Sequence, residues 1–198
     1  MGFSLSWTAV RGRSPEDVLT TLELRPTGER SDDLPRREAP FSWAKFGDWV
    51  LVLSDSSSPW FGKRFVDESS AAERFLAELS GGGEVVACFV EEHVMYSRAA
   101  AWKDGVRRWS VAHDSEKGVA HLQVDGEPPA SLLTLAADAR AAQAGDDEVD
   151  HVFEVPVDLA RDVTDFRHDG GSLVFEVLAV DRKPGRRRSF LDRILGRG

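Results

Sequence analysis

The stretch EVVACFVEEHVMYSRAAAWKDGVRRWSVAHDSEKGVAHLQVDG, residues 84–126, decides the fold. Asp104-Gly105 lies between two strand-like runs and is the strongest hairpin signal in the chain, because these residues tolerate the positive φ angles of a two-residue turn. Residues 85–90 are apolar without alternation, which predicts a strand buried on both faces. Residues 115–118 mark a second turn. The stretch therefore predicts an extended hairpin or meander over about residues 84–124.

Strand patterns also occur outside this stretch. Residues 3–9 alternate between apolar and small polar side chains, which predicts a half-buried strand. Residues 49–53 form a continuous apolar run, which predicts a central strand buried on both faces. Residues 152–155 predict a short strand and residues 173–180 a last one. Residues 26–40 contain several prolines and predict a loop.

Helix signals separate these strands. Ser14 is an expected N-cap and Pro15 suits the first helical position, so a short helix should follow. Further helices are expected over residues 70–79, from Pro128 to Gln143 and over residues 158–166. This order predicts an α+β fold with a mixed or mostly antiparallel sheet packed against three to four helices.

Charge divides the chain into two parts. The net charge is −9, but residues 182–198 carry seven basic residues against one acidic residue, or +6, so residues 1–181 carry −15. We therefore expect one acidic domain over residues 1–181 and a basic C-terminal tail over residues 182–198. An acidic body repels phosphates and disfavours nucleic acid, whereas it attracts a basic protein. The tail could at most touch an anionic membrane weakly.

The single cysteine indicates the compartment. Cys88 lies in an apolar run and is expected to be a small buried hydrophobe. One cysteine allows no intrachain disulfide, so a reducing cytoplasm is the expected location. The N-terminal residues lack the basic and apolar regions of a signal peptide, and no run approaches the length of a transmembrane helix.

The hairpin register assigns residues to two faces. With a two-residue turn, Trp102 pairs with Arg107 and Ala100 pairs with Trp109. One face, expected to face the core, would then hold Val94, Tyr96, Arg98, Trp102, Trp109 and Val111. The other, polar face would hold Glu91, His93, Met95, Ser97, Ser110, Ala112, Asp114, His121 and Gln123. A one-residue bulge at Lys103-Asp104-Gly105 would change both assignments.

Three interpretations of the polar face stay open. It is a solvated sheet face, a protein-binding surface, or a catalytic or metal site. The last would use Glu91, His93, Asp114 and His121. As candidate binding residues we take Glu91, His93, Ser97, Asp114 and His121 from this face, together with Trp60 in a Ser-rich loop. Residues 91–93 lack the two-histidine spacing of a zinc protease. We therefore assign no catalytic residue, metal ligand or cofactor.

Two parts of the chain resemble known sequences. Residues 86–97 with Trp102-Lys103-Asp104-Gly105 and residues 109–114, and the opening residues 2–12, resemble a group of small uncharacterised bacterial proteins. The resemblance implies a bacterial cytoplasmic setting. It supplies no activity and no catalytic residues.

These observations favour a non-enzymatic binding protein. Its most specific form is an immunity-like or antitoxin-like inhibitor that presents acidic and aromatic surface to a basic toxin or effector. The alternatives are a small enzyme or ligand- or metal-binding domain that uses the polar sheet face, and a homodimer that pairs through exposed sheet.

Overall fold

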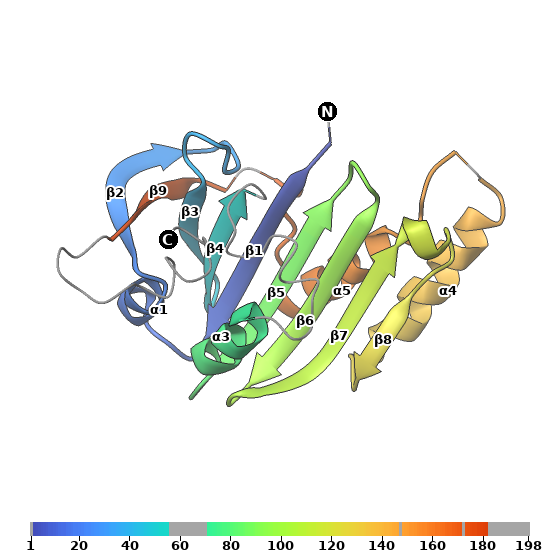
Figure 1. The fold of residues 1–198 in the computed structure, drawn as a ribbon, viewed down its shortest axis with the longest axis horizontal. Helices are drawn as coiled ribbons and strands as arrows, with labels where there is room; N and C mark the ends of the chain where they lie inside the picture. Colours follow the sequence, from blue (N-terminus) through green and yellow to red (C-terminus); the bar gives the residue numbers. More distant parts are fainter. Residues whose placement is uncertain (1, 56–70, 147, 172, 182–198) are drawn as a thin grey trace.

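The computed structural model describes residues 2–55, 71–146, 148–171 and 173–181. Within them, nine strands form one antiparallel sheet in the order β2-β9-β3-β4-β1-β5-β6-β7-β8 (Figure 1). The strands are β1 (Ser4–Arg11), β2 (Leu24–Ser31), β3 (Phe41–Phe46), β4 (Trp49–Asp55), β5 (Glu84–Glu91), β6 (Tyr96–Lys103), β7 (Val106–Asp114), β8 (Gln123–Gly126) and β9 (Phe175–Val180). The α+β class is confirmed, and the sheet dominates the fold more than the sequence predicted.

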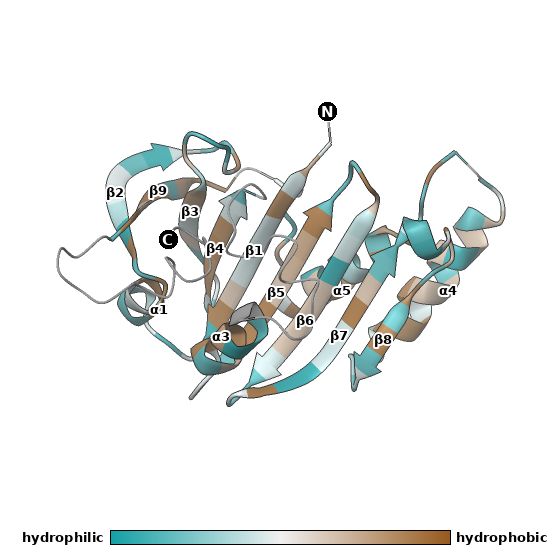
Figure 2. Ribbon diagram, in the orientation of Figure 1, coloured by the Kyte–Doolittle hydropathy of each residue, from teal (hydrophilic) through white to brown (hydrophobic). Residues whose placement is uncertain are grey.

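Helices pack on both faces of this sheet. Helices α1 (Pro15–Thr21) and α3 (Ala71–Leu79) lie on one face, whereas α4 (Ser131–Gln143) and α5 (Glu154–Thr164) lie on the other (Figure 1). The central strands are consequently buried on both sides, and polarity increases toward the edge strands β2 and β8 (Figure 2). Among the described residues, no helix is both long and apolar enough to cross a membrane.

Several local predictions are confirmed. The Ser14 side chain accepts a hydrogen bond from the Asp17 backbone N–H, with Pro15 at the first helical position. Strands β4 and β5 are buried on both faces. Asp104 and Gly105 have φ angles of 51° and 81°, as a two-residue hairpin turn requires. Cys88 is 1% exposed, and burial raises the pKa of its thiol far above the ordinary value.

Three predictions about secondary structure are wrong. Strand β1 is buried on both faces rather than half-buried, because helices cover both sides of the sheet. Strand β2 occupies residues 26–31 of the predicted loop over residues 26–40, because the edge position tolerates Pro26 where an inner strand would not. The predicted strand over residues 152–155 instead leads into α5.

The predicted hairpin register is also wrong beyond the turn. Trp102 pairs with Arg107 as expected, but the next pair is Ala101 with Trp109, so Arg108 is an extra residue in β7. This bulge moves Trp109 to the opposite face from Trp102. Trp102 and Trp109 therefore pack into the two hydrophobic cores on opposite faces of the sheet, instead of into one.

Candidate functional site

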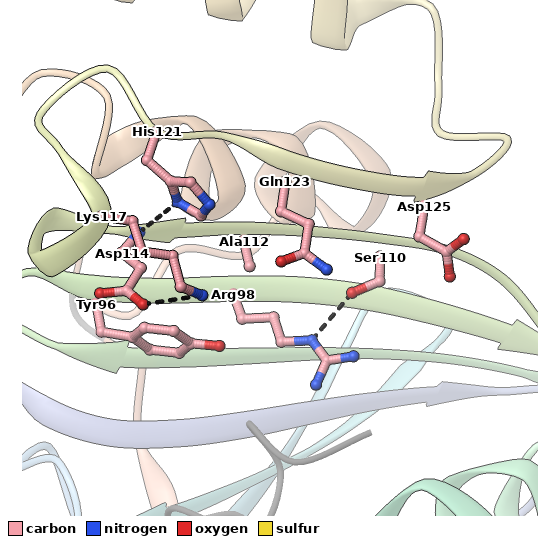
Figure 3. Close-up of a pocket in the computed structure, with 9 residues that line it drawn as sticks. All are labelled: Tyr96, Arg98, Ser110, Ala112, Asp114, Lys117, His121, Gln123 and Asp125. Carbon is pink, nitrogen blue, oxygen red and sulfur yellow. Dashed lines mark hydrogen bonds and ion pairs between the residues drawn. The ribbon is translucent and has the colours of Figure 1, made fainter. Parts of the chain in front are cut away.

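A shallow depression of about 80 Å³ lies on the face of β6, β7 and β8 that also carries α3 (Figure 3). The bulge places Tyr96 and Arg98 of β6 here beside Ser110 and Asp114 of β7. The residues that follow β7 complete the lining. They are Lys117, His121, Gln123 and Asp125. We call this surface the β6–β8 surface.

Buried ion pairs hold one side of the β6–β8 surface. The Arg98 guanidinium is 2% exposed, and its Nε donates to Ser110 Oγ at 2.9 Å (Figure 3). Its Nη2 donates to Glu73 Oε1 of α3 at 2.9 Å, and the same oxygen accepts from Arg107 Nη1 at 3.0 Å. Arg107 also pairs with Asp125 of β8. One helix and three strands are thus linked by charge-assisted hydrogen bonds.

Asp114 organises the other side of this surface. Its Oδ1 accepts from the Glu116 backbone N–H at 3.2 Å, which caps the short helical turn Ser115–Lys117. Its Oδ2 lies 3.2 Å from Lys117 Nζ. The Asp114 backbone N–H donates to His121 Nδ1 at 3.1 Å. Asp114 therefore positions both Lys117 and His121.

The protonation state of His121 follows from these contacts. Since Nδ1 accepts a hydrogen bond, the proton of the neutral ring lies on Nε2. Burial and then the positive charge of Lys117 lower the pKa of His121, while Asp114 opposes that shift. The ring is therefore neutral at pH 7 and offers an N–H donor.

A second polar group lies on the opposite face of the sheet. His113 is fully buried; its Nδ1 lies 2.8 Å from the His121 carbonyl oxygen and its Nε2 lies 2.9 Å from Asp150 Oδ2. Asp150 also accepts from the Phe153 backbone N–H just before α5. The contact between His113 and Asp150 connects β7 to the segment before α5. Alternation of side chains does not reveal this group, since the bulge reverses the face of His113, and Asp150 is distant from His113 in the chain.

The structure separates the predicted site residues. Asp114 and His121 meet on the β6–β8 surface. His93 lies 3.0 Å from Glu91 Oε1 and lines a different, open depression of about 410 Å³ at the turn after β5. Ser97 is fully buried on the opposite face, where its Oγ donates to the Phe153 carbonyl oxygen at 2.6 Å. Trp60 lies outside the described residues.

The alternation of side chains did not identify Arg98 as a member of the β6–β8 surface. Arg98 lies on the same face of β6 as Trp102, as predicted, but the bulge places Ala112 instead of Val111 opposite it and brings the polar residues of β7 to this face. Its best sequence signal was a long charged side chain within an apolar strand, which requires an acidic partner when it is buried. Glu73 supplies that partner from another element, which the sequence could not indicate.

The size and pairing of these groups limit their chemistry. A volume of about 80 Å³ is well below the roughly 300–1,000 Å³ of ordinary small-molecule pockets. The Ser110 hydroxyl accepts from an arginine instead of facing a base, so the geometry does not activate it as a nucleophile. Within the described ranges, no cluster of three or more His, Cys, Asp or Glu residues is arranged to hold a metal ion.

Comparison with known proteins gives no further assignment: no family model, curated protein or solved structure matches this chain.

Proposed function

We propose that this protein is a non-enzymatic binding protein that recognises a basic partner protein through the β6–β8 surface. The observation that carries the proposal is that the charged groups of this surface are fixed by one another. Arg98 and Arg107 share Glu73, and Lys117 pairs with Asp114. A surface fixed before binding loses little conformational entropy when a partner docks.

The surroundings of this surface also suit a protein partner. Val94 and Val119 are 51% and 56% exposed and lie in the two turns that border it. The turns adjoin, because Ser115 Oγ donates to the Val94 carbonyl oxygen. Apolar side chains beside fixed polar groups are the usual composition of a protein–protein interface.

Charge selects the kind of partner. The net charge of −15 over residues 1–181 attracts basic proteins and repels nucleic acid. Gln123 and Asp125 are exposed at the edge strand β8, where they can accept hydrogen bonds from lysine or arginine. An immunity-like or antitoxin-like inhibitor of a basic toxin or effector is the most specific form of this proposal, acting in the bacterial cytoplasm.

The test uses the full chain as bait in native lysate at low salt. Gln123→Lys places a positive charge on the β6–β8 surface, and Leu133→Lys places the same charge on α4, where Leu133 is 77% exposed. We expect the wild-type chain and Leu133→Lys to retain one stoichiometric basic protein. Gln123→Lys should release it, because like charges repel across an interface.

Two results would contradict the proposal. Failure of the wild-type chain to retain any stoichiometric partner at low salt would argue against a binding protein. Equal retention by all three chains would place the partner elsewhere on the molecule. Circular dichroism of both variants must match the wild type, so that lost binding reports the surface and not unfolding.

A further inference from the structure

A separate cavity of about 160 Å³ lies between the loop after α5 and the loop between β2 and β3. Aromatic rings form its inner wall. Phe166 and Phe175 are buried, and the rings of Phe46 and Phe166 meet edge-on with centroids 5.9 Å apart. The negative faces of such rings attract cations, and organic cations above all.

Carboxylates surround the same cavity. Asp32 and Asp165 line it, are exposed, and form no hydrogen bond or ion pair with their side chains among the described residues. Asp165 is held in a left-handed conformation with φ of 60° at the end of α5. A third carboxylate, Asp169, also lines the cavity.

Arg167 is the one cation among the described residues that line the cavity, and its charge is more than compensated. It pairs with Asp169 at 2.6 Å, with Glu154 at 2.6 Å and with Asp158 at 2.5 Å. Three carboxylates thus surround one guanidinium, although Arg161 also contacts Asp158 at 3.3 Å. The cavity is therefore an unfavourable site for an anion and a favourable one for a cation.

His168 lies in the cavity wall and is 8% exposed. Its Nδ1 is enclosed and has no hydrogen-bond partner among the described residues. A buried polar atom without a partner is costly and rare in proteins. An edge-on contact with Phe3, at 4.9 Å between ring centroids, holds the imidazole in place. Burial lowers the pKa of His168, so the ring is neutral at pH 7 and adds no positive charge to the cavity wall.

We propose that this cavity, the His168 pocket, binds a small organic ammonium group. Phe46 and Phe166 would face its methyl or methylene groups, and Asp32 and Asp165 would balance its charge. At about 30 Å³ for each water, the volume holds about five waters, enough for a methylated amine. The aromatic wall disfavours a hydrated metal ion. This site is independent of the β6–β8 surface and of the proposed function.

The experiment is a titration of the full chain with dimethylammonium chloride, followed by the imidazole NMR signals of its five histidines. Sodium chloride at equal ionic strength controls for salt, and 2-propanol controls for shape without charge. We expect dimethylammonium alone to shift the His168 signals saturably, with a dissociation constant on the order of millimolar, as suits so few atoms.

Substitutions locate the site. Asp32→Asn removes a carboxylate from the rim and should weaken binding about two- to five-fold. Asp33→Asn is the matched control, since Asp33 is an exposed neighbour that pairs with Arg36 instead of lining the cavity. Phe46→Leu removes a π face and should weaken binding by a similar factor.

Several outcomes would overturn this proposal. They are the absence of a saturable His168 shift with dimethylammonium, an equal shift with 2-propanol or sodium chloride, and equal weakening by Asp33→Asn and Asp32→Asn. Retained binding in both Asp32→Asn and Phe46→Leu would also reject the pocket.

Discussion

His113 and Asp150 form an ion pair beneath the sheet, with His113 Nε2 2.9 Å from Asp150 Oδ2 across 37 positions of sequence. The other ring nitrogen lies 2.8 Å from the His121 carbonyl oxygen, which can only accept. The His113 side chain is fully buried and that of Asp150 is 9% exposed, so little water can replace this contact.

Removal of this carboxylate should be costly. Asp150→Ala leaves the buried His113 without its partner and should lower the free energy of unfolding by about 3 kcal/mol. Asp150→Asn should cost clearly less, because its amide can donate to a neutral His113 ring. Urea unfolding measures both values. A loss below about 1 kcal/mol for Asp150→Ala would contradict a stabilising buried pair.

Ser110 should stabilise the protein through the buried Arg98. Ser110→Ala removes the acceptor 2.9 Å from Arg98 Nε and should lower the free energy of unfolding by about 1–3 kcal/mol. Ser115→Ala is the control, since Ser115 Oγ bonds at the exposed turn and its loss should cost under about 1 kcal/mol. If Ser110→Ala and Ser115→Ala lose equal free energy of unfolding, measured by heat or urea, the buried contact stabilises the protein no more than the exposed one.

Gly126 ends β8 where a side chain cannot fit. Its φ is 75°, and an added Cβ would lie 2.1 Å from the Arg108 carbonyl oxygen. Gly28 has a similar φ of 84°, but none of the described residues lies within 4 Å of the Cβ position there. Gly28→Ala should therefore cost only the conformational strain, about 1–2 kcal/mol, whereas Gly126→Ala should cost more or detach β8. Hydrogen exchange of the β7 and β8 amides would separate these cases, and identical exchange in the two variants would refute the clash.

Acid should destabilise the protein through His168. Burial lowers its folded-state pKa from the ordinary 6.5, so below that pH the unfolded chain binds a proton that the folded chain does not. Stability is thus greatest above pH 6.5 and falls as the pH drops toward the folded-state value. His121 contributes with the same sign.

A variant isolates the contribution of His168. His168→Phe keeps an aromatic ring against Phe3 and cannot titrate. Between pH 7 and pH 5 its stability should fall less steeply than that of the wild type, by up to about 1.4 kcal/mol per pH unit for one proton. Urea unfolding across this range measures the slope, and an unchanged slope would show that His168 does not control the acid response.

Local signals in the sequence determined many elements of this fold. Asp104-Gly105 fixed the turn between β6 and β7, because its residues adopt positive φ without large cost. Ser14 and Pro15 fixed the start of α1, and continuous apolar runs identified β4 and β5 as buried. Each signal depends on residues within one turn or one strand, so the sequence alone is sufficient to show it.

Tertiary structure alone decided the faces and the sites. The extra residue Arg108 exchanges the two faces of β7, and alternation cannot reveal a single inserted residue. As a result, Asp114 and His121 meet as predicted while Ser97 lies on the other side of the sheet. The partners of the buried charges come from distant elements. A buried charge requires an oppositely charged or hydrogen-bonding partner, but the sequence does not show which residue supplies it.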